Sequence, residues 1–343
     1  FSGTIIMSDI EQRKVQLTGG STYTVSLPKE WAVENQISAG SLVNFYPEGN
    51  SIVLSAEKKN SRNGTSANID GMEMDEIVRT VVTMYVSGFE IIELQSNGIS
   101  TEQRRAVRDI TRQLVGMEII DETPTMMKLK DLLDSSEFSI IGAVERMESM
   151  ALSMFSDSIE SIKLNDLGLS KDVIERDDDI DRLWFVVSRA FRTSLKSPSK
   201  LQELGLEKID CFDYHTCARQ LERIGDHAAK ISYIKQELGD IPEPIRKGLG
   251  NLHEASREII DLAIESMKME DKNMAKEAAN ISRAKVILIE KLVLEMMRST
   301  VKDLDVSDAQ KIGLILDSVS RCADYGGNIA ETVLQKVSPH PEF

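Results

Sequence analysis

The long C-terminal region of the chain, from Ser135 onward, constrains the fold most strongly. Apolar residues recur there at the spacing of an α-helix over several long segments. The expected helices cover about 137–163, 170–195, 205–238, 243–270, 273–300 and 306–336. Amphipathic helices of this length bury their apolar faces against one another, so the sequence predicts one or two up-and-down helical bundles.

Two stretches of this helical region are similar in sequence. Residues 221–231 (LERIGDHAAKI) align with residues 319–329 (VSRCADYGGNI), and the Arg, the Asp and the final Ile coincide. Chance similarity between amphipathic helices is the alternative explanation. Helical periodicity alone does not require an Arg-x-x-Asp sequence followed by small residues, so the sequence favours two tandem three-helix bundles.

The N-terminal 58 residues have a different character. Short β-branched runs alternate there with turns rich in Gly and Ser. They predict four short strands and one short helix, at residues 12–17, 23–27, 29–34, 42–46 and 51–55. Such a unit has a small core and usually needs a partner chain to be stable.

A polar segment without apolar periodicity, residues 57–71, is the clearest expected linker. The region after it alternates helical and strand patterns and predicts a small α/β unit. Its expected helices are 73–87 and 101–114, and its expected strands are 89–94, 118–121 and 126–129. The predicted domains are therefore 8–57, 72–133, 134–240 and 241–337.

The charge balance limits the function classes. The 343 residues carry a formal net charge of −15, so the chain as a whole is a poor polyanion binder and any DNA contact must be local. Cys211, Cys217 and Cys322 form no Cys-x-x-Cys pair, which is typical of reduced, cytoplasmic proteins. No apolar run approaches the length of a membrane span, so we expect no membrane insertion.

A run of acidic residues opens the second expected helix. Within Glu175–Asp181 (ERDDDID), Asp178 and Asp179 each point within about 60° of Glu175 at 100° per residue. Glu222 and Asp226 form an i, i+4 pair on the next long helix. If the two helices are antiparallel neighbours, these two groups of carboxylates can face each other.

Crowded carboxylates repel unless a cation or protons intervene, and ligand sets of oxygen atoms suit Mg, Mn or Fe. A solvated acidic face near a helix N-terminus is the alternative. The second repeat retains Asp324 but has Ser320 in place of Glu222, and Glu290 is the one acidic residue within 284–290. The sequence therefore predicts a metal cluster in the first repeat and a remnant, Asp324, in the second.

These acidic motifs resemble the PhoU family of phosphate-signalling proteins over about residues 135–337. The resemblance implies two tandem three-helix bundles whose Glu/Asp-x-x-x-Asp motifs hold metal clusters. It implies a divalent or trivalent metal ion, with Mg, Mn or Fe expected and Zn possible. It also implies a partner, namely a phosphate transporter ATPase or a signalling protein. The implied ligands are Glu175, Asp178 or Asp179, Glu222 and Asp226.

The N-terminal residues 13–31 (RKVQLTGGSTYTVSLPKEW) resemble the SpoVT/AbrB family. In that family two chains interlace their hairpins into one DNA-binding barrel. The resemblance implies a homodimer that contacts operator DNA through Arg13, Lys14 and Lys29. The combined fold is then mixed but mainly α: a swapped-hairpin β barrel, a small α/β connector and two PhoU-like bundles, as in archaeal phosphate-uptake regulators.

The charge of the N-terminal residues leaves their role open. Residues 1–58 hold four basic and six acidic side chains, which is not a basic footprint. A dimer could still gather Arg13, Lys14 and Lys29 on one face. The alternatives are a dimerisation module or a protein-interaction platform without DNA contact.

The sequence thus predicts a cytoplasmic, DNA-binding regulator of phosphate uptake and signalling that is not an enzyme. One alternative is a carboxylate-bridged metalloenzyme, but no Glu lies three residues before His215, His227, His253 or His340, as a di-iron bundle requires. A second alternative is a regulator that binds a phosphate transporter and no DNA. A third is direct phosphate sensing by arginines, whose more ordinary role is pairing with nearby carboxylates. The arginines concerned are Arg219, Arg223 and Arg321.

Overall fold

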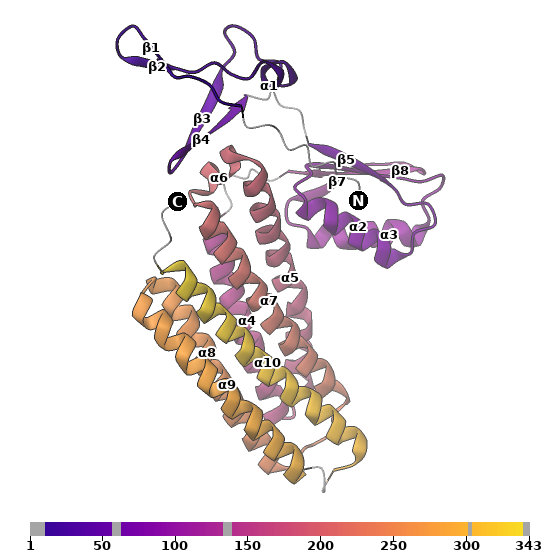
Figure 1. The fold of residues 1–343 in the computed structure, drawn as a ribbon. Helices are drawn as coiled ribbons and strands as arrows, with labels where there is room; N and C mark the ends of the chain where they lie inside the picture. The colour runs from indigo at the N-terminus through magenta and orange to yellow at the C-terminus, as the bar shows by residue number, and fades with distance from the viewer. Residues whose placement is uncertain (1–10, 57–62, 133–138, 301–303, 339–343) are drawn as a thin grey trace. The chain divides into compact units, whose positions relative to one another are not determined.

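The computed structural model describes residues 11–56, 63–132, 139–300 and 304–338 (Figure 1). Within the ninth helix, the side chains of residues 290, 293, 296, 297, 299 and 300 are not described. The chain forms two compact units that divide between residues 61 and 62.

The N-terminal unit consists of two β-hairpins and a short helix. Its elements are β1 (Gln16–Thr18), β2 (Thr22–Thr24), α1 (Lys29–Glu34), β3 (Val43–Glu48) and β4 (Ser51–Ala56). Strand β1 pairs with β2 and β3 pairs with β4, both antiparallel. Within residues 11–56 no side chain is buried, and apolar residues such as Leu17, Tyr23 and Phe45 are 59%, 77% and 62% exposed. One chain alone therefore gives this unit no core, and the interlaced two-chain arrangement remains a prediction.

The second unit begins with a four-stranded sheet covered on one face by two helices. Its elements are β5 (Gly64–Asn68), α2 (Met74–Val86), β6 (Ile91–Gln95), α3 (Thr101–Gln113), β7 (Met117–Glu122) and β8 (Met126–Asp131). The strand order is β5-β6-β8-β7, with β5 parallel to β6 and the other pairs antiparallel. Ile92, Leu94, Met127 and Leu129 point into the core beneath the helices. Alternate residues of the same strands face the other side of the sheet.

Strand β5 corrects the expected linker. Residues 64–68 (GTSAN) belong to the sheet, although the sequence predicted a linker over the whole of residues 57–71. The strand pattern was missed because β5 is an edge strand of small, mostly polar residues. Only Thr65 and Ala67 of this strand are partly buried. Two such positions are too few to give a recognisable alternation of apolar and polar residues.

The rest of the second unit is helical, as predicted. The helices are α4 (Ile140–Lys163), α5 (Leu167–Lys196), α6 (Pro198–Leu204), α7 (Lys208–Glu237), α8 (Glu243–Met269), α9 (Lys272–Thr300) and α10 (Val306–Lys336). Six of them are the expected long helices. The additional short helix α6 has Pro198 at its first turn, where proline is tolerated, so the predicted break is a helix start. No described helix is long and apolar enough to cross a membrane.

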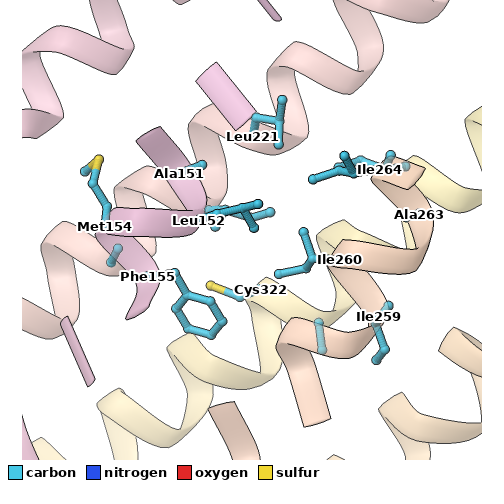
Figure 2. Packing of buried hydrophobic residues seen from close by; sticks show 14 of the residues in the cluster. Ala151, Leu152, Met154, Phe155, Leu221, Ile259, Ile260, Ala263, Ile264 and Cys322 are labelled. Atoms are coloured by element: carbon cyan, nitrogen blue, oxygen red, sulfur yellow. The ribbon is translucent and has the colours of Figure 1, made fainter. Parts of the chain in front are cut away.

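The two sets of three long helices share one hydrophobic core. Helices α4, α5 and α7 form the first bundle and α8, α9 and α10 the second, with α10 packed along α7. Figure 2 shows the contact region, where Phe155 of α4 and Leu221 of α7 lie near Ile260 of α8 and Cys322 of α10. The repeats are therefore halves of one continuous core.

Helix α5 also makes polar contacts with the α/β layer. The Arg189 guanidinium donates hydrogen bonds to the Tyr85 and Phe89 carbonyl oxygens, the latter at 3.0 Å, and pairs with Asp131 at 2.7 Å. Lys196 Nζ donates to the Ser87 carbonyl oxygen at 3.0 Å. Two cationic side chains of α5 thus donate hydrogen bonds to carbonyl oxygens at and just beyond the C-terminal end of α2, where the helix dipole is negative.

Candidate metal centre

The close approach of α5 and α7 creates the candidate site. Gly225 of α7 lies against Ile180 of α5, and a Cβ atom at position 225 would come within 3.0 Å of Ile180 Cδ1. Ile180 is fully buried. The residues that follow these two in the sequence, Asp181 and Asp226, are therefore carried on facing turns of the two helices.

Three carboxylates meet at this crossing. One oxygen from each of Asp181, Glu222 and Asp226 lies within 4.8 Å of the others, and no other such group of three exists among the described residues. Glu222 is buried, Asp181 is half-buried and Asp226 is exposed. The group is therefore accessible from solvent on the Asp226 side.

Burial and mutual repulsion make ionisation of these groups unfavourable. Burial, with the nearby charge of Asp226 as a second cause, raises the pKa of Glu222 to about 7. Burial also raises the pKa of Asp181 to about 7 and that of Asp177 to about 6, with repulsion from neighbouring carboxylates adding to both. The pKa of Asp226 is raised as well, mainly because neighbouring protein atoms displace part of the water around its carboxylate. Without a cation, the site therefore retains protons near neutral pH.

Arg219 is the main protein cation beside the group. Its Nη1 atom donates to Glu222 Oε1 at 2.6 Å, while its guanidinium carbon lies 5.1 Å from the centre of the Trp184 ring. The other oxygen, Glu222 Oε2, is buried and has no hydrogen-bond partner, and the same holds for Asp177 Oδ1. A buried carboxylate oxygen without a partner is costly, so these atoms are available for a ligand.

The donor set fits a hard cation. All its members are carboxylates, which Mg²⁺, Mn²⁺ and iron accept, whereas Zn²⁺ more often takes nitrogen or sulfur. Asp181, Glu222 and Asp226 would hold the ion. Asp177 lies one turn before Asp181 on α5 and would supply a fourth carboxylate at the edge of the site.

The other acidic residues expected as ligands lie outside the group. Glu175 pairs with Lys171 at 3.6 Å, Asp178 accepts a hydrogen bond from Gln113 Nε2 at 3.2 Å, and Asp179 lies 3.8 Å from Arg182. All three carboxylates are exposed. The structure thus brings Glu222 and Asp226 together with Asp181, and sequence reasoning missed Asp177 and Asp181.

The second repeat shows no comparable group among its described side chains. Asp324 lies 3.5 Å from Arg321, and Arg321 also lies 3.9 Å from Asp317. The Glu290 side chain lies outside the described part of the chain. The ion pairs of Arg219 and Arg321 correspond to the ordinary structural role of these arginines.

The expected DNA-binding side chains are exposed in the N-terminal unit. Arg13 pairs with Glu11 on the surface, and Lys14 and Lys29 are exposed.

A comparison with protein families finds a match for the residues around the candidate site. Residues 144–234, which span most of α4, all of α5 and most of α7, match the PhoU domain. The first helical bundle is therefore similar to the PhoU domain. Residues 16–62 match the bacterial antitoxin MazE, described as an antidote-toxin recognition domain. The predicted PhoU resemblance is confirmed, and the candidate carboxylates all lie inside the matched residues.

Two solved PhoU structures are similar to the chain at low identity. PhoU from Pseudomonas aeruginosa is 18% identical, with 57% of this chain and 93% of that chain covered and a TM-score of 0.45. The phosphate transport system regulatory protein PhoU from Streptococcus pneumoniae is also 18% identical, with 57% and 91% covered and a TM-score of 0.46. No curated protein matches the chain.

Proposed function

We propose that the chain is a non-enzymatic regulator of phosphate uptake whose PhoU domain holds a metal ion between α5 and α7. The single observation that carries this proposal is the carboxylate group Asp181, Glu222 and Asp226 inside the PhoU match. The bound ion would supply the positive charge that lets these carboxylates stay ionised together. Metal loading would then favour one arrangement of α5 and α7, which a transporter ATPase or signalling partner would recognise.

Metal analysis with matched variants tests this proposal. The purified protein is analysed for bound elements, and Mn²⁺ affinity is measured by calorimetry. We expect Glu222→Gln and Asp226→Asn each to weaken binding at least tenfold, because each removes a charged donor from the group. The controls Glu175→Gln and Asp179→Asn change exposed carboxylates of α5 and should retain wild-type affinity. Equal metal content in all four variants would contradict the proposed site.

We also propose that the N-terminal unit forms a homodimer that binds operator DNA through Arg13, Lys14 and Lys29. The MazE match and the lack of buried side chains in residues 11–56 support a two-chain unit. The exposure of the three cations is compatible with phosphate contact.

The DNA proposal is tested by anisotropy with sheared genomic DNA as the probe, at several salt concentrations. Substituting Arg13 and Lys14 together with Gln should weaken binding and reduce the salt dependence, because fewer counterions are released. Lys276→Gln, on the exposed face of α9, is the matched control. No binding by the wild type at low salt would favour a regulator that acts on a transporter without DNA.

The regulator proposal also predicts no turnover. The protein is incubated with a chromogenic phosphate monoester and Mn²⁺ or Fe²⁺. Hydrolysis that disappears in Asp226→Ala would contradict the regulator assignment and favour the metalloenzyme alternative.

A further inference from the structure

The two edges of the α/β sheet are protected to different degrees. The β7 edge carries Glu118, Asp121 and Glu122, and its register shifts between Ile119 and Asp121. Charges and bulges are the usual means by which proteins prevent an edge strand from pairing with another chain. The β5 edge has neither: its sequence is GTSAN, and it pairs with β6 in continuous register.

The backbone of β5 presents unused hydrogen-bonding groups along this edge. The Asn63 carbonyl oxygen accepts from Ile91 N at 3.3 Å, and Ile69 N donates to the Gln95 carbonyl oxygen at 2.8 Å. Alternate residues of a parallel strand bond to the same neighbour. Residues 63, 65, 67 and 69 therefore face β6, and the N–H and C=O groups of Gly64, Ser66 and Asn68 point away from it. No strand of the described chain lies on that side.

We infer that β5 pairs antiparallel with the same strand of a second copy, joining two four-stranded sheets into one of eight strands. This inference rests on the homodimer of the proposed function. A two-fold axis makes the pairing antiparallel and isologous. Ser66 then lies opposite the partner's Ser66, and Gly64 lies opposite the partner's Asn68. Each such pair exchanges two N–H···O hydrogen bonds through its outward-pointing backbone groups.

The connection to the N-terminal unit favours a second copy over any other strand. Strand β4 ends at Ala56 and β5 begins at Gly64, so the connection spans at most about 27 Å. Dimerisation of the N-terminal unit therefore holds two copies of β5 close together, at an effective concentration on the order of millimolar. A strand from an unrelated protein has no such tether.

The side chains of β5 are compatible with self-pairing. Ser66 and Asn68 lie on the open face of the sheet, while Thr65 and Ala67 face the helices. All are small and uncharged, so antiparallel pairing places no like charges opposite each other. The β7 edge, with its acidic side chains, would repel its own copy.

Cysteine cross-linking tests the pairing in the full-length protein. The native cysteines Cys211, Cys217 and Cys322 are buried, so background cross-linking is low. In the proposed dimer the Cα atoms of the two Ser66 residues lie about 5.5 Å apart, within disulfide range. We expect Ser66→Cys to form a disulfide-linked dimer under mild oxidation. The matched control is Gln95→Cys, an exposed position on β6 whose two copies lie at least about 14 Å apart.

The mass of the wild-type protein, measured by light scattering, distinguishes the absence of β5 pairing from the absence of a dimer. A dimeric wild type in which Ser66→Cys cross-links no faster than Gln95→Cys would overturn edge pairing and leave the N-terminal dimer intact. A monomeric wild type would overturn both. Disulfide adducts of Ser66→Cys with other proteins, in place of its own copy, would also overturn the inference.

A proline variant gives a second readout. The Ser66 N–H points away from β6, so Ser66→Pro should leave the sheet of each copy folded. It would remove the central hydrogen bonds of the pairing. We expect the amides of Gly64 and Asn68 to be protected from hydrogen exchange in the wild type and to lose at least tenfold of that protection in Ser66→Pro. Unprotected amides in the wild-type dimer would contradict the pairing.

Discussion

Gly225 of α7 and Ile180 of α5 lie in direct contact, and a Cβ atom at position 225 would also come within 3.1 Å of Ile180 Cγ2. Each of these residues is followed in sequence by a carboxylate of the candidate metal site. The contact therefore sets the distance between Asp181 and Asp226. A larger side chain at position 225 would push the two helices, and the two carboxylates, apart.

The first prediction concerns this contact. Gly225→Ala should lower the free energy of unfolding by about 1–3 kcal/mol, because Ile180 has to move or the helices have to separate. It should also weaken Mn²⁺ binding. Chemical denaturation and calorimetry measure the two effects.

The control for this prediction is Gly239→Ala, since nothing lies within 4 Å of a Cβ atom there. Combining Gly225→Ala with Ile180→Val makes room at the contact and should restore part of the Mn²⁺ affinity. Unchanged stability and metal binding in Gly225→Ala would show that the helices tolerate a wider spacing.

The second prediction is a pH dependence of the metal-free protein. The folded-state pKa values of Asp181 and Glu222, about 7, exceed the unfolded values near 4. Between these values the folded state binds more protons than the unfolded state, so stability falls as pH rises from about 4 to 7. Thermal unfolding in the presence of a chelator should show this fall, and Mn²⁺ should reverse it at pH 7 and above.

The variant Asp181→Asn, which cannot ionise at this position, should flatten the dependence. Asp179→Asn, which changes an exposed carboxylate of the same helix, should leave it in place. A stability that rises over the same pH range in the metal-free protein would be incompatible with the raised pKa values.

The third prediction concerns Arg189. Its ion pair with Asp131 is largely buried, since the side chains are 13% and 14% exposed. Arg189→Met should destabilise the α/β layer by about 3 kcal/mol, because it leaves the Asp131 charge without this partner. Arg189→Lys should restore little of the lost stability, since one ammonium group cannot reproduce the several fixed hydrogen bonds of the guanidinium. Hydrogen exchange should accelerate in β6 and β8, with α8 and α10 unaffected.

The fourth prediction concerns the N-terminal unit. Leu17 is 59% exposed in one chain, so Leu17→Ser would be nearly neutral for an isolated monomer. If the unit is a two-chain structure, Leu17→Ser should weaken dimerisation at least tenfold, measured by analytical ultracentrifugation. Val306→Ser, at a position 77% exposed at the start of α10, is the control and should leave the dimer constant unchanged.

The long helices could be predicted because each presents a repeated apolar stripe over many turns. Strand β5 could not, since a five-residue edge strand buries too little to show a pattern. Within the site, Glu222 and Asp226 could be identified from their spacing. On α5 the sequence predicts Glu175, Asp178 and Asp179 as ligands, but these three side chains are exposed.

The sequence of α5 does contain a signal for the carboxylates that face α7. Ile180 and Trp184 mark the face of α5 toward its neighbours, and Asp177 and Asp181 lie on that side of the helix at i, i+4 spacing. Asp177 and Asp181 lie beside the buried face and approach the next helix, whereas Glu175, Asp178 and Asp179 are exposed. Which face is buried is decided by tertiary packing, which the periodicity of one helix only partly reveals.

The contacts of Arg189 also determine how the chain can be shortened. A fragment cut between β8 and α4 would leave this guanidinium without its three acceptors and would expose Phe185, which packs against the core of the α/β layer. A truncated chain that begins at α4 is therefore expected to be less stable than one that keeps the α/β layer, although the family match begins only at residue 144. The α/β layer and the first bundle act as one folding unit, so the contacts of α5, and not the limits of the family match, decide where the chain can be shortened.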